Sequence, residues 1–161
     1  MSDAGLMEDL YREIILDHYR QPRNRHAVES PSCSADGSNP LCGDQVTVAV
    51  VVDGDRITEI GFSGQGCSIS QASASMMTEY VRGRTVAEAR AGVDAFQQMM
   101  TTGTVAGLEG FDDIDALVGV AKFPARVKCA SLAWKTLEQA LNEGGAPVAT
   151  PVTTDERNSN G

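Results

Sequence analysis

The fold of this chain is decided by the stretch VTVAVVVDGDRITEIGF, residues 46–62. Its first seven residues are almost all β-branched, which is typical of a strand. The sequence DGD that follows is a turn signal, and from Arg56 to Phe62 polar and apolar residues alternate. We therefore expect two antiparallel strands joined by a tight turn.

Two short turns flank this hairpin. The turn with Cys42 and Asp44 leads into the first strand, and the turn with Gly64 and Cys67 leaves the second strand. Because the strands run antiparallel, the start of the first lies beside the end of the second. We expect the two turns to be neighbours in space.

Helical patterns surround the hairpin. An N-terminal helix from Met7 should stop near Pro22, whose ring cannot continue it. Later helices are expected over residues 69–81, from a capping box at 85–88 to 103, over 112–120, and from 124 to 144. Residues 28–39 are polar and turn-rich, so they form either a weak edge strand or a loop.

These elements predict one α+β domain over residues 1–146. It should contain a small antiparallel sheet of about three strands, with helices packed mainly on one face. The 161 residues, 42% of them hydrophobic, suffice for one domain with a full core. Residues 147–161 have no periodicity and the composition of a disordered tail.

Charge and hydropathy exclude several classes of function. Thirteen basic against 22 acidic residues give a net charge of -9, which repels nucleic acid and anionic lipid surfaces. No apolar run is long enough to span a bilayer, and the N-terminus lacks the pattern of a signal peptide. We expect a cytoplasmic protein with reduced cysteines, for which metal ligation is a better interpretation than disulfides.

Three cysteines and one carboxylate have the spacing of a metal site. Cys42, Cys67 and Cys129, with Asp44, offer four donors, which is the number that tetrahedral zinc takes. The same set could hold an iron-sulfur cluster, and the residues alone leave both open. A carboxylate in place of a fourth thiolate makes a zinc site easier to open, and a displaced thiolate is a nucleophile that can accept sulfur.

Other residues with metal-binding chemistry have simpler interpretations. Cys33 has no partner at metal spacing, so we interpret it as a bystander thiol. His18 lies on the apolar stripe of the first helix and His26 follows a basic turn, and neither is placed in the site. Lys128 and Arg126 fit ordinary solvated helix positions equally well.

With these residues laid out, the chain resembles the SufU-type proteins of the IscU/NifU N-terminal superfamily, which serve iron-sulfur cluster biogenesis. The resemblance covers most of the chain. It is carried by LYREIILDHY (10–19), PRN (22–24), NPLCGD (39–44), GQGCSIS (64–70), ASASMM (72–77) and KFPARVKC (122–129).

The resemblance implies a SufE/IscU-like fold and one zinc ion bound by Cys42, Asp44, Cys67 and Cys129. It also implies that Cys42 accepts persulfide sulfur from a SufS-type cysteine desulfurase. The chain would act as a sulfurtransferase-type partner and activator of that enzyme, and would pass sulfur to downstream Suf scaffold components. Arg126 would help to dock the partner.

Two departures from the IscU branch favour sulfur transfer. An IscU scaffold has histidine just before its third cysteine, where this chain has Lys128, which cannot easily ligate while charged. The leucine- and proline-rich chaperone motif of IscU is replaced by FPAR, residues 123–126. Two alternatives remain: a scaffold that assembles a [2Fe-2S] cluster on the same cysteines, and an interaction module whose zinc only holds the fold.

Overall fold

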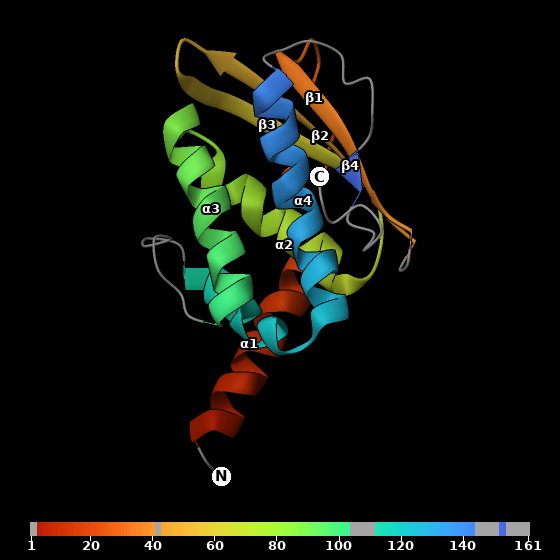
Figure 1. Cartoon of the computed structure of the whole chain (residues 1–161), viewed down its shortest axis with the longest axis vertical. Helices are drawn as coiled ribbons and strands as arrows, with labels where there is room; N and C mark the ends of the chain where they lie inside the picture. The colour runs from red at the N-terminus through yellow and green to blue at the C-terminus, as the bar shows by residue number, and fades with distance from the viewer. Residues whose placement is uncertain (1–2, 41–42, 104–111, 144–151, 154–161) are drawn as a thin grey trace.

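The structure, a computed structural model, describes residues 3–40, 43–103, 112–143 and 152–153 of the chain. Its elements in chain order are α1 (Asp3–Arg20), β1 (Cys33–Asn39), β2 (Asp44–Asp53), β3 (Arg56–Gln65), α2 (Ser68–Val81), α3 (Val86–Thr102), the 3-10 helix η1 (Asp112–Lys122), α4 (Pro124–Glu143) and β4 (Val152–Thr153). Figure 1 shows the helices gathered on one side of a sheet, with the N-terminal part of α1 projecting away from it.

The sheet has the strand order β3-β2-β1-β4. The expected hairpin of β2 and β3 closes with Asp53 opposite Arg56, and Gly54 in the turn has a positive φ of 67°. β1 pairs antiparallel with β2, and the two-residue β4 pairs in parallel with β1. The predicted α+β class, with a small antiparallel sheet, is confirmed.

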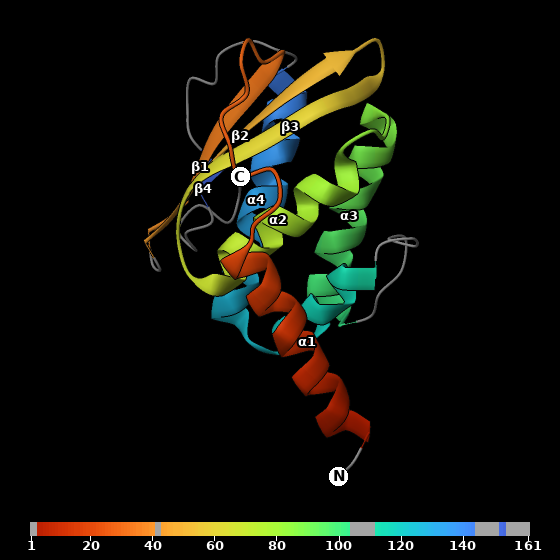
Figure 2. The same cartoon turned by 180° about the vertical axis from the view of Figure 1, so that it is seen from behind.

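The core lies between the sheet and the helices. α4 lies in front of the strands in Figure 1 and behind them in Figure 2, so it covers one face of the sheet. The Trp134 ring of α4 stacks on Phe96 of α3 with 4.5 Å between ring centroids, and its indole N–H donates to Ser73 of α2 at 3.0 Å. This buried tryptophan therefore ties the three helices together.

The opposite face of the sheet is crossed by the segment between α1 and β1 (Figure 2). The Phe62 amide of β3 donates to the Asn24 carbonyl at 3.0 Å. A Cβ at Gly61 would lie 2.4 Å from the His26 carbonyl oxygen, so only glycine permits this approach. His26 therefore belongs to the covering segment.

Strand β1 resolves the alternative left open for residues 28–39. It is a true strand between β2 and β4, with Cys33, Ala35, Gly37 and Asn39 buried in alternation. Its polar, small residues conceal this pattern in the sequence, because β1 packs closely under α4. A Cβ at Gly37 would lie 2.1 Å from the hydroxyl of Thr136.

Three further boundaries differ from expectation. The first helix begins at Asp3, and the helix predicted over residues 112–120 is a 3-10 helix that continues to Lys122. Within the predicted disordered tail, the structure describes Val152–Thr153 as β4, and residues 147–151 and 154–161 lie outside the described part. None of the described helices is long and apolar enough to cross a membrane.

Candidate metal centre

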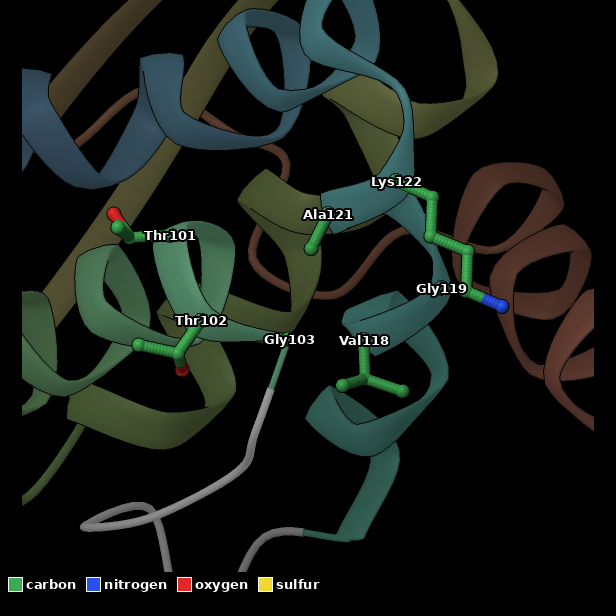
Figure 3. Close-up of a pocket in the computed structure, with 7 residues that line it drawn as sticks. All are labelled: Thr101, Thr102, Gly103, Val118, Gly119, Ala121 and Lys122. Atoms are coloured by element: carbon green, nitrogen blue, oxygen red, sulfur yellow. The ribbon is translucent and has the colours of Figure 1, made fainter.

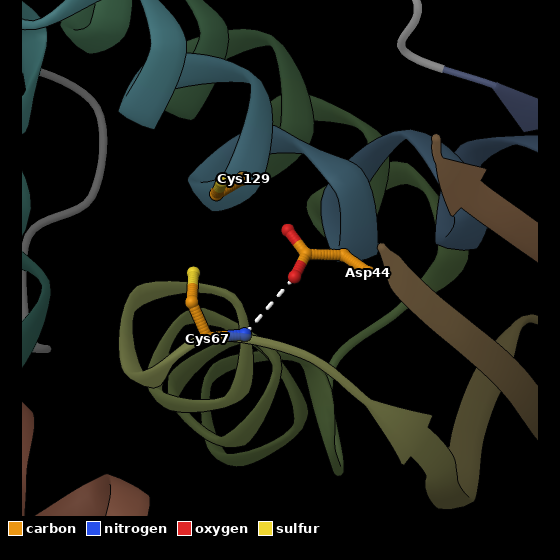
Figure 4. Close-up of side chains that lie close together, drawn as sticks. All are labelled: Asp44, Cys67 and Cys129. Carbon is orange, nitrogen blue, oxygen red and sulfur yellow. Dashed lines mark hydrogen bonds between the residues drawn. The ribbon is translucent and has the colours of Figure 1, made fainter. Parts of the chain in front are cut away.

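Three side chains that are far apart in the sequence meet at the end of the hairpin. Asp44 begins β2, Cys67 lies between β3 and α2, and Cys129 lies in the second turn of α4. One ligand atom from each lies within 4.8 Å of the others. Figure 4 shows the three residues converging from three separate segments. Asp44 and Cys67 are therefore neighbours, as the antiparallel hairpin predicts, and α4 adds the third residue.

The two carboxylate oxygens of Asp44 have different environments. The side chain is fully buried, and Oδ1 accepts a hydrogen bond from the Cys67 backbone N–H at 3.0 Å (Figure 4). Oδ2 is also buried, and has no hydrogen-bond partner among the described residues. A buried carboxylate oxygen without a partner is strongly destabilising unless a cation binds it. This orphan oxygen points to a metal ion.

The glycine before Cys67 makes this arrangement possible. A Cβ at Gly66 would lie 2.5 Å from Asp44 Oδ1, which is closer than the two atoms can approach. The absence of a side chain at Gly66 therefore lets the turn close over the carboxylate. The contact with Asp44 therefore requires glycine at position 66.

Cys67 is half-buried and occupies the N-cap position of α2, where its side chain makes no capping hydrogen bond. The helix dipole at this end favours a negative charge. Cys129 is fully buried, and its Sγ lies 3.6 Å from the Ala125 carbonyl and 3.9 Å from Asn39 Nδ2. The two sulfurs thus differ in access to solvent.

Arg126 brings positive charge to the sulfurs. The thiolates of Cys67 and, to a lesser extent, Cys129 raise the pKa of this exposed guanidinium. Arg126 therefore acts on the site itself, and its role in partner docking stays a prediction.

Cys42, the fourth predicted ligand, lies outside the described residues. The residues on either side of its loop are placed, because Asn39 pairs with Asp44 in the β1–β2 register. Consecutive Cα atoms are separated by 3.8 Å, so the Cα of Cys42 is at most about 7 Å from that of Asp44. The ligation of the metal by Cys42 stays a prediction.

The donor set suits zinc. Two cysteine sulfurs and one carboxylate oxygen are all common zinc ligands, and Asp44 Oδ2 is held as a single available oxygen by the hydrogen bond to Oδ1. Among the described residues, the chain therefore provides three ligands that fit a tetrahedral ion.

Comparison with known proteins decides the family. A family model described as the NifU-like N terminal domain matches residues 10–143. The chain belongs to this family. It is 44% identical to the zinc-dependent sulfurtransferase SufU of Bacillus subtilis, over 90% of this chain and 99% of that protein. It is 37% identical to the iron-sulfur cluster assembly scaffold protein IscU of Streptococcus pyogenes, over 84% of each chain.

Solved structures of NifU-like proteins share the fold. The crystal structure of FiSufU from Fervidobacterium islandicum AW-1 superposes with a TM-score of 0.75 at 37% identity, covering 80% of this chain and 94% of that one. An N-terminal NifU-like protein from Brucella abortus gives a TM-score of 0.75 at 26% identity, over 84% and 94% of the two chains. The resemblance drawn from the sequence motifs is confirmed, and so is the role of the family in iron-sulfur cluster assembly.

The residues that the sequence analysis set aside lie elsewhere. Cys33 is buried in β1 within the core. His18 is fully buried, with Nδ1 2.8 Å from Ser75 Oγ and Nε2 2.8 Å from Asp113 Oδ2. Glu79 lies near His18 and Asp113, and one possible ligand atom from each of the three residues lies within 4.8 Å of the others. Both ring nitrogens already have partners, so His18 is a structural link between α1, α2 and η1.

A shallow hollow between the end of α3 and η1 is separate from the metal centre. It has a volume of about 480 Å³ and is lined by Thr101, Thr102, Gly103, Val118, Gly119, Ala121 and Lys122. Figure 3 shows the Lys122 side chain extending away from the two threonines. The two threonine hydroxyls donate to carbonyls of their own helix. The hollow therefore presents little chemistry for a ligand.

Sequence reasoning missed one residue of the site. Asn39 is fully buried beside Cys129, although it was quoted only as part of a family motif. An asparagine at the end of a strand usually indicates a turn, so only its three-dimensional contact with α4 could identify it.

Proposed function

We propose that this protein is a zinc-dependent sulfur acceptor and carrier, which takes persulfide sulfur on Cys42 from a SufS-type cysteine desulfurase. The observation that carries the proposal is the orphan oxygen of buried Asp44, which lies beside Cys67 and Cys129. A carboxylate ligand is harder and more easily exchanged than a thiolate. A site of this composition suits a reaction in which one ligand leaves the metal.

The transfer step is a thiol exchange. The Cys42 thiolate attacks the outer sulfur of the desulfurase persulfide, a new sulfur–sulfur bond forms on Cys42, and the bond to the desulfurase cysteine breaks. The electron pair and the negative charge leave with that cysteine, so no external oxidant or reductant is needed. Bound zinc would keep the thiolates deprotonated and protected from oxidation until the exchange.

The chain's own residues supply the rest. Asp44, Cys67 and Cys129 would hold the metal when Cys42 leaves it, since they project from β2, the start of α2 and α4. A zinc ion with three thiolates and a carboxylate carries net negative charge, and Arg126 offsets part of it. The similarity to the Bacillus subtilis sulfurtransferase over nearly its whole length supports this assignment.

The second candidate is an assembly scaffold for a [2Fe-2S] cluster, favoured by the relatives named IscU. Lys128 opposes it, because a charged ammonium group cannot replace the histidine ligand expected of that branch. The two candidates share the cysteines and differ in the metal.

The test begins with anaerobic purification and measurement of zinc and iron. A cysteine desulfurase and cysteine are then added, and peptide mass spectrometry locates any added sulfur. We expect one zinc per chain and one sulfur atom gained on Cys42, with the gain lost in Cys42→Ser and retained in Cys33→Ser. Iron with visible absorbance and no sulfur gain would establish the scaffold instead, and zinc with no sulfur gain would leave a structural site.

A further inference from the structure

Asn39 is the last residue of β1 and lies directly beside the metal centre. It is fully buried and pairs in register with Asp44. Its Nδ2 donates toward Cys129 Sγ at 3.9 Å, while Oδ1 is buried without a partner among the described residues. The two orphan oxygens of the described chain thus belong to Asn39 and Asp44, which lie opposite each other at the same end of the sheet.

The fold alone does not explain this side chain. A buried carboxamide whose carbonyl oxygen has no partner destabilises the folded state relative to an apolar side chain of similar shape. Thr136, another buried polar side chain between α4 and the sheet, is by contrast satisfied by the Leu132 carbonyl at 2.7 Å. Asn39 is therefore retained at a cost in stability, beside a sulfur that it contacts.

The amide orientation follows from the sulfur. A thiolate is an acceptor, so the N–H end of the amide faces it favourably, whereas a carbonyl oxygen there would oppose one lone pair to another. An N–H···S bond withdraws electron density from a metal-bound sulfur and fixes its direction. A sulfur held in this way is a poorer nucleophile and a more firmly retained ligand.

We propose that Asn39 is a positioning residue that retains Cys129 on the metal, so that Cys42 is the cysteine that leaves and reacts. The inference rests on the proposed function, because it presupposes Cys42 as the sulfur acceptor. It adds a physical reason for the retention of Cys129, which is fully buried and hydrogen-bonded to Asn39.

The principal variant is Asn39→Leu, which keeps a branched side chain and removes the amide. Zinc-loaded protein is mixed with a chromogenic chelator to measure the rate of zinc release, and with iodoacetamide to find which cysteine is alkylated first. We expect release to accelerate by about 10- to 100-fold, as for loss of other outer-shell partners. We expect Cys42 to react first in the wild type, and alkylation of Cys129 to rise toward that of Cys42 in the variant.

A second readout separates positioning from a structural role. Because no described residue pairs with Oδ1, the melting temperature of metal-free Asn39→Leu should equal or exceed that of the metal-free wild type. The increase in melting temperature on adding zinc should be smaller in the variant. Thr136→Val is the matched control: it removes a buried polar group from α4 that contacts β1 but not the sulfurs, and zinc release should stay within twofold of wild type.

Asn39→Asp is the second variant, and it decides the question if Asn39→Leu does not fold. It keeps the size of the side chain but replaces the N–H donor by a carboxylate oxygen, whose negative charge repels the thiolate, so Cys129 should again lose its protection. If the wild type binds zinc and alkylates first at Cys42, but the folded Asn39 variants match it within twofold, the positioning role is wrong and the proposed function stands. If the wild type holds no zinc, or alkylates all its cysteines equally, the proposed function fails as well.

Discussion

Two groups of side chains in the described part of this protein have the residue types and spacing of a metal site, and they differ in whether their polar atoms have hydrogen-bond partners. Asp44, Cys67 and Cys129 meet at the end of the sheet, and one buried carboxylate oxygen has no partner among the described residues. His18 and Asp113, with Glu79, meet between α1, α2 and η1. There, both histidine nitrogens are hydrogen-bonded.

The difference distinguishes a functional site from a structural link. His18 is hydrogen-bonded to Ser75 through one ring nitrogen and to Asp113 through the other, as the histidine of a Ser-His-Asp triad is bonded to its two partners. Ser75 is fully buried, however, and its oxygen also accepts the Arg23 backbone N–H at 2.8 Å, so no substrate can reach it. Proximity of ligand-type residues is therefore weak evidence for a site, and an unsatisfied buried atom is stronger evidence.

The largest expected effect is that of Asp44→Ala. Asp44 is the carboxylate that the described residues bring to the centre, and its removal should lower zinc affinity by at least about 100-fold. Loss of a residue that only hydrogen-bonds a metal ligand costs up to about 100-fold, and loss of a ligand should cost no less. Sulfur transfer to Cys42 should fall with it, while the helical circular dichroism persists. Chelator competition measures the affinity. Unaltered affinity would remove Asp44 from the metal centre and erase the contrast between the two groups.

His18→Ala should affect stability instead of metal binding. It creates a cavity and removes one buried and one partly buried hydrogen bond, so we expect a loss of about 2–4 kcal/mol in the free energy of unfolding. Urea unfolding of the metal-free protein measures this loss. Zinc affinity of the folded variant should stay within twofold of wild type, and a large decrease there would mean that the two groups are coupled.

Gly66→Ala tests the closure of the turn over Asp44. The added Cβ would lie 2.5 Å from Oδ1, so the carboxylate must shift, and we expect zinc to bind about 10-fold more weakly. Gly119→Ala, in η1, is the matched control, because no atom lies within 4 Å of its added Cβ. Equal zinc affinities in the two variants would show that the Asp44 position does not matter.

The smallest expected effect concerns Asp17, which precedes His18 in α1. A hydrogen bond from Arg23, and then its positive charge, lower the pKa of Asp17 below its ordinary value of 3.8. A lowered carboxyl pKa contributes stability above the unfolded-state value, and this contribution is lost as the pH falls through the folded-state pKa. Arg23→Met should raise the pKa of Asp17, and the stability gap between variant and wild type should close below about pH 3.8. An NMR titration in which the pKa of Asp17 does not move would contradict the pairing.

Much of the fold could be predicted from the sequence because its signals are local. The hairpin of residues 46–62 and the capping box at Thr85 and Glu88 were both found in the structure. β1 was ambiguous because its small polar residues obscure the alternation that only the packing of α4 on Gly37 explains. The 3-10 form of η1 was missed because its apolar periodicity resembles that of an α-helix.

The candidate site was partly predictable for the same reason. Antiparallel pairing of β2 and β3 brings Asp44 and Cys67 together, and this follows from the hairpin alone. The position of Cys129 beside these two residues depends on how α4 packs across β1 and β2. The fourth ligand, Cys42, lies outside the described residues, so its place in the site stays a prediction.

The sequence by itself determined the chemical inventory: the thiols, the carboxylate, the glycines that permit the turns, and the hairpin that joins two of the ligand turns. Only the tertiary structure decided which atoms are satisfied, because a hydrogen bond between residues 18 and 113, or 39 and 129, has no local signal in the chain. The presence or absence of a partner matters because these atoms are buried. An oxygen without a protein partner is hydrated at the surface, whereas in the interior it destabilises the folded state.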